Sequence, residues 1–342
     1  MDITFIVMWL GFILAAYSVV GNDVIQTLGT FLTSNERTQK WYVLWGFAAL
    51  IMVTALTYGY YQEDISYGRL SKFEMPSHYP WYYLLPPVVL LLITRSGIPV
   101  STTFMILTLF SLSGIPNDIG SLLSNTFDTD TKLGGMIQKS VMGYIVSFVS
   151  ALLIYLFISR LTEKRFINST ITKSGQRFWM VAQWCTTGFL WFQWLTQDLA
   201  NIYIYLRGGN DLSTFGFFIS VAILLGLLAY IFYQRGGAVQ DVVRQKSNTA
   251  DIRSATFIDL IYGVILYIFK YNYLGLFEAQ LPMSTTWVFI GLLAGREIGM
   301  QLNMHRKVDF TIARMIFADL GKVFFGLIVS VVLVFIIKLL AG

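Results

Sequence analysis

Two polar clusters, each built around one aspartate, follow apolar segments of the sequence. The first is Gly21-Asn22-Asp23-Val24-Ile25-Gln26-Thr27-Leu28-Gly29-Thr30, and the second is Thr196-Gln197-Asp198-Leu199-Ala200-Asn201. Carboxylates, amides and hydroxyls are hard oxygen ligands, which suit Na⁺ or protons and argue against a transition metal. We therefore expect cation ligands among Asn22, Asp23, Gln26, Thr27, Gln197, Asp198 and Asn201, with Na⁺ held at Asn22, Asp23, Gln197, Asp198 and Asn201.

These aspartates need a reason to lie within apolar sequence. A carboxylate at membrane depth costs about 2.5–3.5 kcal/mol on insertion scales, and such residues mark functional sites by default. The structural alternative is that Asp23 and Asp198 cap broken helices and satisfy nearby N–H groups. We favour the functional interpretation because two carboxylates occupy matching positions.

A second pair of motifs offers hydrogen-bond donors. Pro99-x-Ser101-Thr102-Thr103 and Pro282-x-Ser284-Thr285-Thr286 each precede an apolar run, with proline near the first turn and hydroxyls at cap positions. A helix start inside the membrane presents free N–H groups and the positive end of the helix dipole, which together favour an anion. One such motif alone would be an ordinary helix cap, but two copies favour an anion site.

The two kinds of site imply each other. Carboxylates repel an anion unless cations lie between them, so the sequence predicts cation-coupled anion transport. The expected substrate contacts are Ser101, Thr102, Thr103, Ser284, Thr285 and Thr286, together with Asp23 and Asp198.

Composition indicates an all-α integral membrane protein. The 342 residues are 56% hydrophobic and only 13% charged, which is too much apolar surface for a soluble domain to bury. The lipid bilayer is therefore an expected partner. The net charge of +5 reflects loops beside the membrane, and we expect no nucleic-acid partner. One cysteine and two histidines exclude an internal disulfide and a multi-cysteine metal site. We expect no cofactor beyond Na⁺ or protons as coupling ions, and we allow for a homodimer.

The order of segments indicates an internal duplication. Asp198 follows Asp23 by 175 residues (198 − 23), and Pro282 follows Pro99 by 183 (282 − 99). We expect repeat 1 at 1–162, a basic linker at 163–177 and repeat 2 at 178–342. The expected crossings are Ile3–Val20, Trp41–Tyr60, Met136–Ser159, Phe178–Leu195, Phe215–Tyr233 and Thr311–Leu340.

Each repeat also contains a pair of apolar runs that meet at a hydroxyl motif. Trp81–Ser96 and Phe104–Leu112 are short for a full crossing, so we expect a re-entrant hairpin, with Phe257–Phe277 and Trp287–Gly295 as its counterpart. Three crossings per repeat is an odd number. The predicted fold is therefore two inverted-topology repeats with broken helices and re-entrant hairpins, the first helix breaking at its polar cluster.

Loop charges predict the orientation. A cytoplasmic linker at 160–177 places most basic loops inside and the acidic loops around Glu63 and Asp128 outside, as the positive-inside rule requires. Arg69, Lys72 and Lys132 run against this trend. We expect a multi-pass protein of the cell (inner) membrane with both termini extracytoplasmic.

These motifs together resemble the inorganic phosphate transporter (PiT) family of cation-coupled symporters. That family carries Gly-Ala-Asn-Asp-Val-Ala-Asn-Ala in each inverted repeat, followed by Gly-x-Pro-Val-Ser-Thr-Thr-His at the hairpin. In the first half of the chain, the likeness covers residues 20–30 and 97–103. In the second half it covers residues 196–201 and 281–286. It implies phosphate uptake driven by Na⁺ or H⁺, with cations at the Asn/Asp motifs and the oxyanion at the Ser-Thr-Thr tips.

The sequence also departs from that family pattern. Gln26 and Gln197 each replace one asparagine, in opposite places of the two copies, and Phe104 and Trp287 stand where the family has histidine. Sulfate or another oxyanion is therefore an alternative substrate. An anion channel is less favoured, because buried acidic sites paired with anion sites indicate coupling. A membrane enzyme acting on phosphate esters is also less favoured, since no nucleophile constellation appears, and we predict that the protein is not an enzyme. Lys270 either approaches the anion or extends from a hairpin limb to the membrane surface.

Overall fold

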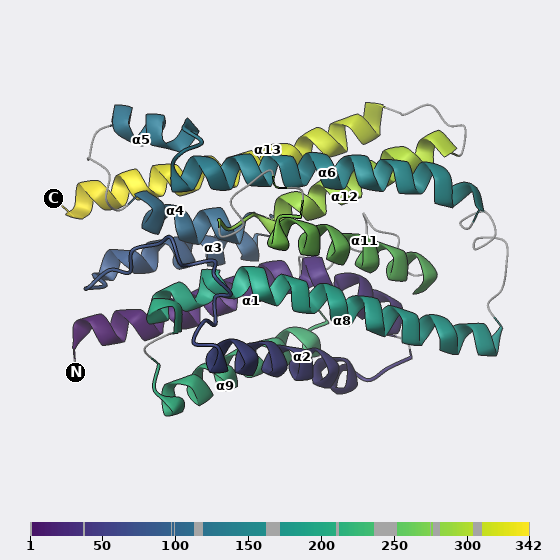
Figure 1. Cartoon of the computed structure of the whole chain (residues 1–342), viewed down its shortest axis with the longest axis horizontal. Helices are drawn as coiled ribbons and strands as arrows, with labels where there is room; N and C mark the ends of the chain where they lie inside the picture. Colours follow the sequence, from purple (N-terminus) through teal and green to yellow (C-terminus); the bar gives the residue numbers. More distant parts are fainter. Residues whose placement is uncertain are drawn as a thin grey trace.

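The computed structural model describes residues 2–36, 38–96, 98, 100–112, 119–161, 172–209, 212–235, 252–273, 275, 281–303 and 310–341. Apart from loops, these residues are helical (Figure 1). The helices are α1 (Ile3–Asn35), α2 (Trp41–Tyr61), η1 (Trp81–Leu84), α3 (Leu85–Arg95), α4 (Thr102–Leu112), α5 (Ile119–Phe127), α6 (Lys132–Leu161), α8 (Lys173–Tyr203), η2 (Ile204–Gly209), α9 (Thr214–Tyr233), α11 (Ile252–Tyr271), α12 (Thr285–Asn303) and α13 (Phe310–Ala341).

The all-α membrane fold is confirmed. Among the described helices, six contain a segment long and apolar enough to cross a membrane. They are Ile3–Val24, Trp41–Tyr61, Ser124–Leu156, Thr214–Tyr233, Ile252–Tyr271 and Ala313–Leu340. The predicted crossing at 178–195 lies in α8, which is outside this set although it has 31 residues. Its lower hydropathy fits its place between neighbouring helices, where much of its surface faces protein.

The predicted break in the first helix is wrong. α1 is one continuous helix of 33 residues that contains the whole polar cluster. The polar side chains find partners without unwinding the backbone, and Thr27 donates back to the carbonyl oxygens of Asp23 (3.0 Å) and Val24 (3.1 Å). α8 likewise continues through Gln197-Asp198. Its helix geometry changes only afterwards, in η2, where Arg207 has a φ of 52°.

The first hairpin has short limbs, as expected. α3 and α4 have 11 residues each, which at about 1.5 Å per residue is roughly half of a bilayer core about 30 Å thick. α11 and α12 are longer, with 20 and 19 residues, so the second hairpin extends beyond its predicted limb at 287–295. In Figure 1, α3 and α4 lie toward the end that carries both termini, and α11 and α12 toward the opposite end. Gly97 and Pro99 fall outside the described residues, as do residues 163–171 of the predicted linker.

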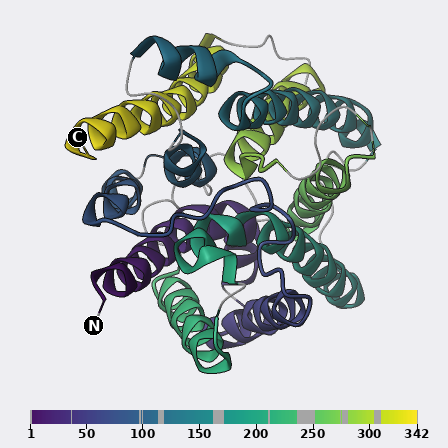
Figure 2. The ribbon, with the colours of Figure 1, turned by 60° about the vertical axis from the view of Figure 1, so that its left-hand side comes forward.

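The two halves of the chain are interleaved. α4 packs against α13 and α12 against α6, whereas α1 packs against α3 and α8 against α11. Figure 2 shows α6, α12 and α13 on one side of the molecule and α1, α2, α8 and α9 on the other. Each side therefore contains helices from both predicted repeats. α5 was not expected, since it lies in the segment assigned to an acidic loop.

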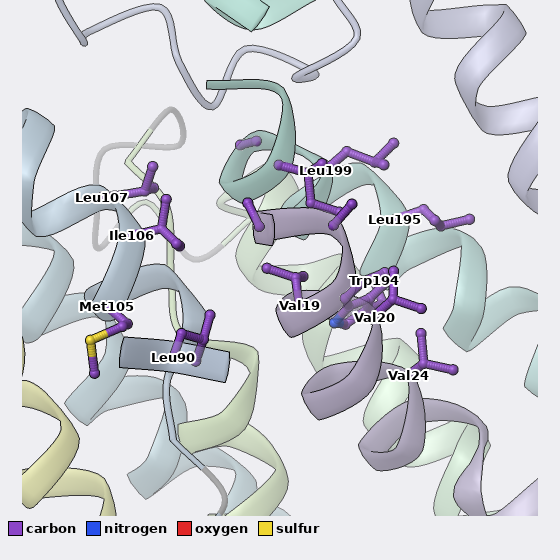
Figure 3. Packing of buried hydrophobic residues seen from close by; sticks show 14 of the residues in the cluster. Val19, Val20, Val24, Leu90, Met105, Ile106, Leu107, Trp194, Leu195 and Leu199 are labelled. Carbon is purple, nitrogen blue, oxygen red and sulfur yellow. The ribbon is translucent and has the colours of Figure 1, made fainter. Parts of the chain in front are cut away.

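Apolar residues that flank the polar clusters hold these helices together. Val20 and Val24 of α1, Leu195 and Leu199 of α8, and Ile106 of α4 belong to one buried cluster (Figure 3). The polar clusters therefore lie within the apolar core of the protein.

A row of glycines brings α12 against α6. A Cβ atom at Gly291 would lie 2.4 Å from the Tyr144 carbonyl oxygen, and one at Gly295 would lie 2.1 Å from that of Phe148. Gly299 continues the row four residues later. Small residues at this spacing allow membrane helices to pack backbone to backbone.

We expect Gly295→Ala to destabilise the protein by about 1–3 kcal/mol, because the added methyl group forces the α6 and α12 backbones apart. Gly226→Ala is the matched control, since a Cβ atom there meets nothing within 4 Å. Thermal unfolding of both variants in the same detergent measures the difference. Equal melting temperatures would contradict the close packing of this helix pair.

Candidate functional site

The first carboxylate lies at the contact between α1 and the first hairpin tip. Asn22 Nδ2 donates to Asp23 Oδ1 (2.6 Å) and to the Val100 carbonyl oxygen (2.7 Å). The Thr102 hydroxyl donates to Asp23 Oδ2 (2.6 Å). Asp23 is only 1% exposed, so this carboxylate is held by protein donors and is shielded from solvent.

The second carboxylate, Asp198 of α8, has an equivalent set of partners. Asn201 Nδ2 donates to Asp198 Oδ1 (2.8 Å), and the Thr103 hydroxyl donates to the same oxygen (3.3 Å). Asn201 Nδ2 also lies 3.3 Å from the Thr102 hydroxyl oxygen and 3.2 Å from that of Thr103. Adjacent threonines of one tip therefore connect carboxylates from both halves of the chain.

Adjacent threonine hydroxyls bring the two carboxylates into one hydrogen-bonded group, and two negative charges so placed repel each other. Both are completely buried, so water screens little of this repulsion. A cation placed between them would relieve the repulsion.

The second hairpin tip meets the same place. The Thr286 hydroxyl donates to the Val100 carbonyl oxygen (3.3 Å), which also accepts from Asn22. The Thr285 side chain lies against Asp198, and its carbonyl oxygen accepts from the Tyr262 hydroxyl (3.0 Å). The structure thus brings both tips and both aspartates into one connected group.

The first serine of each tip makes the ordinary N-cap interaction. The Phe104 N–H donates to the Ser101 hydroxyl oxygen (3.2 Å), and the Trp287 N–H donates to that of Ser284 (3.4 Å). The geometry is the same in both copies. Each of these hydroxyl groups still carries a proton that it can donate.

Four amide oxygens of the polar clusters lack a hydrogen-bond partner among the described residues. They are Asn22 Oδ1, Gln26 Oε1, Gln197 Oε1 and Asn201 Oδ1. Their residues are at most 3% exposed. Buried acceptors without donors are costly, and a cation is the ligand that such oxygens select. Thr27 differs from these residues, because its hydroxyl is directed to carbonyl groups of its own helix.

Arg69 is a charged residue near the site that the motifs did not single out. It is 1% exposed, and its Nη1 donates to the Leu281 carbonyl oxygen (3.1 Å), just before the second tip. Burial lowers the pKa of the Arg69 guanidinium to about 10, while attraction to Asp198 acts in the opposite direction. Arg69 therefore stays cationic at neutral pH. The sequence did carry one signal for this residue, because Arg69 is a basic residue in a loop that the positive-inside rule places outside.

The aromatic residues that replace the family's histidines contact each other. The rings of Phe104 and Trp287 lie 5.8 Å apart in an edge-to-face arrangement, and both are buried. Lys270 lies over the Tyr67 ring at 4.7 Å, so it belongs to the side of the hairpin and not to the group at the tips.

A third buried carboxylate, Asp259, lies beside α1 near Thr30. Asp259 of α11 accepts hydrogen bonds from the Thr30 and Thr187 hydroxyls, each at 2.5 Å. It thereby ties α11 to both α1 and α8. Asp319 forms an ion pair with Lys322 on its own helix (3.5 Å).

Comparison with known proteins found a similar fold but no similar sequence. No protein-family model matches the chain, and no curated protein matches it in sequence. Among solved structures, the chain is similar to "The sodium-dependent phosphate transporter", with a TM-score of 0.61 and 18% identity. The match covers 99% of this chain and 100% of the other. The fold of this chain is thus similar to that of a solved structure over nearly its whole length.

Proposed function

We propose that this protein is a secondary transporter that takes up inorganic phosphate together with Na⁺. The observation that carries the proposal is the group formed by Asp23, Asp198, Thr102 and Thr103, in which two buried carboxylates share the hydroxyl donors of one hairpin tip. The structurally similar protein is named for the same substrate and the same ion. Protons are the alternative coupling ion.

The hydrogen bonds supply a mechanism for coupling. The Thr102 hydroxyl donates to Asp23 and the Thr103 hydroxyl to Asp198, so neither proton is available to an anion. Na⁺ bound to the carboxylates and amide oxygens competes for the lone pairs that these hydroxyls occupy. The threonines then turn toward an oxyanion, whose charge the Na⁺ ions offset. Cation binding therefore precedes and strengthens anion binding.

The interleaved helices suggest how access alternates. The site lies between the side formed by α1, α2, α8 and α9 and the side formed by α6, α12 and α13. Rocking of one side against the other would open the site first to one membrane face and then to the other. We assign the face that carries both termini to the extracytoplasmic side of the cell membrane, from the loop charges.

We expect proteoliposomes with an inward Na⁺ gradient to accumulate labelled phosphate, and unlabelled arsenate to compete because it matches phosphate in shape and charge. Sulfate should compete poorly. The control is the same vesicles with an equal K⁺ gradient. Uptake that ignores both Na⁺ and proton gradients would contradict symport and favour a channel. Strong competition by sulfate but not by arsenate would point to a sulfate transporter of the same fold.

No observation on the site favours an enzyme. Its chemistry consists of carboxylates that accept hydrogen bonds and hydroxyls that cap helices or donate to carboxylates. The Thr102 and Thr103 hydroxyls donate to Asp23 and Asp198, and we interpret these bonds as holding buried charge at an ion site. We therefore assign transport without chemical conversion of the substrate.

A further inference from the structure

A cavity lies between the start of α6 and the loop that follows α2. Its volume is about 610 Å³, and its walls include Lys72, Lys132 and Lys139. Asp130 is the one carboxylate among the described residues that line it. Among the charged residues of this lining, the lysines thus outnumber the carboxylate by three to one.

The cavity adjoins the second hairpin tip. Leu281 lines it and stands three residues before Ser284. The carbonyl oxygen of Leu281 accepts from Lys139 Nζ (3.0 Å) and from Arg69 Nη1 (3.1 Å). Gly135 permits this approach, because a Cβ atom there would lie 2.6 Å from Leu281 Cδ1. Two buried cations, Lys139 and Arg69, therefore hold the short segment that links the cavity to the tip.

The cavity also lies on the side from which uptake would begin. Figure 1 places the start of α6 toward the end of the molecule that carries both termini. Lys72 and Lys132 are partly exposed there, whereas Lys139 is buried. This gradient of exposure leads from solvent toward the tip.

We propose that this cavity is a receiving site for inorganic phosphate, which binds there weakly before it moves to the hairpin tips. The inference rests on the proposed function and adds to it a separate place where the substrate is first held. A cleft whose charges are mostly of one sign concentrates an oppositely charged substrate, and such steering raises association rates by about 10- to 1,000-fold. Here three lysines and one aspartate line the cavity. An ammonium group only donates hydrogen bonds, which suits an oxyanion, and Lys139 already gives one of its donors to the Leu281 carbonyl oxygen.

The test is phosphate uptake by the double variant Lys72→Gln/Lys132→Gln, at constant Na⁺ and with choline chloride setting the ionic strength. At low ionic strength we expect kcat/KM to fall about tenfold, with the maximal rate unchanged. The difference should vanish near 1 M salt, where the screening length is only about 3 Å. Lys40→Gln, at the exposed start of α2, is the matched control and should behave as wild type at both salt concentrations.

Two results would overturn the receiving site. One is an unchanged kcat/KM at low ionic strength. The other is a loss that is equal at both salt concentrations and accompanied by a lower maximal rate, which indicates a structural defect. Wild-type uptake in the same vesicles reports separately on the proposed function.

A binding measurement tests the cavity even where uptake fails. Equilibrium dialysis of the detergent-purified Asp23→Asn variant should show weak binding of labelled phosphate, and adding Lys72→Gln/Lys132→Gln should weaken it further. Equal binding by the two variants overturns the proposal. In nanodiscs, phosphate should still bind when phosphatidylglycerol is present. Complete displacement by that lipid would assign the cavity to a lipid headgroup instead.

Discussion

Vesicles containing Asp23→Asn or Asp198→Asn should lose Na⁺-driven phosphate uptake. Asparagine keeps the size of the side chain and one oxygen but removes a negative charge from a site that is shielded from water. Each substitution should weaken Na⁺ binding and, by reciprocal linkage, weaken phosphate binding by about 5- to 150-fold. Na⁺ titration of phosphate binding in detergent measures both effects on one sample.

Asp319→Asn is the matched control for these two variants. Asp319 is also a carboxylate on an apolar helix, but it pairs with Lys322 on that same helix and lies outside the hydrogen-bonded group at the tips. We expect its Na⁺ dependence to match that of wild type. If both site variants also keep wild-type Na⁺ dependence, the carboxylates are structural and the symport proposal fails.

The second large effect is expected at Thr102. Its hydroxyl donates to Asp23 and lies within hydrogen-bond distance of Asn201, so it joins α1 and α8 through one tip. Thr102→Val keeps the shape and removes the donor. A hydrogen bond to a charged group contributes about 1.5–3 kcal/mol, which corresponds to about a 10- to 150-fold loss of phosphate affinity.

Two further variants isolate the hydroxyl of Thr102. Thr102→Ser retains the donor and should restore most of the affinity. Thr108→Val removes a hydroxyl that is equally buried on the same helix but faces Ser330, and it should leave phosphate affinity unchanged. A Thr102→Val variant that binds phosphate like wild type would remove the tip from the substrate site.

Much of the fold could be predicted because the length of each apolar segment can be read directly from the sequence. The crossing predicted at 41–60 is α2, and the one predicted at 215–233 is α9, each within one residue. The short limbs of the first hairpin were equally clear. The break in α1 was wrong for a physical reason. A polar cluster reveals that side chains need partners, but not whether the backbone must open to supply them.

The site was predicted in part for a similar reason. The motifs identified the two aspartates and the two tips, yet the pairing of Thr102 with Asp23 and of Thr103 with Asp198 depends on contacts between distant segments. Arg69 showed the same limit. Its charge was anomalous in the sequence, but only the folded loop reveals that it reaches the second tip.

The pairing of α4 with α13 has a consequence for biosynthesis. α13 is the last helix of the described chain, so α4 leaves the ribosome long before the helix that packs against it exists. Until then α4 of the first hairpin lacks the helix that it packs against. Thr102, at the start of α4, is therefore not yet fixed in the position from which it donates to Asp23. The Asp23 carboxylate therefore enters the membrane before its site is complete. Premature termination before α13 should therefore leave α4 without this packing partner, and we expect such a truncated protein to be degraded by the cell.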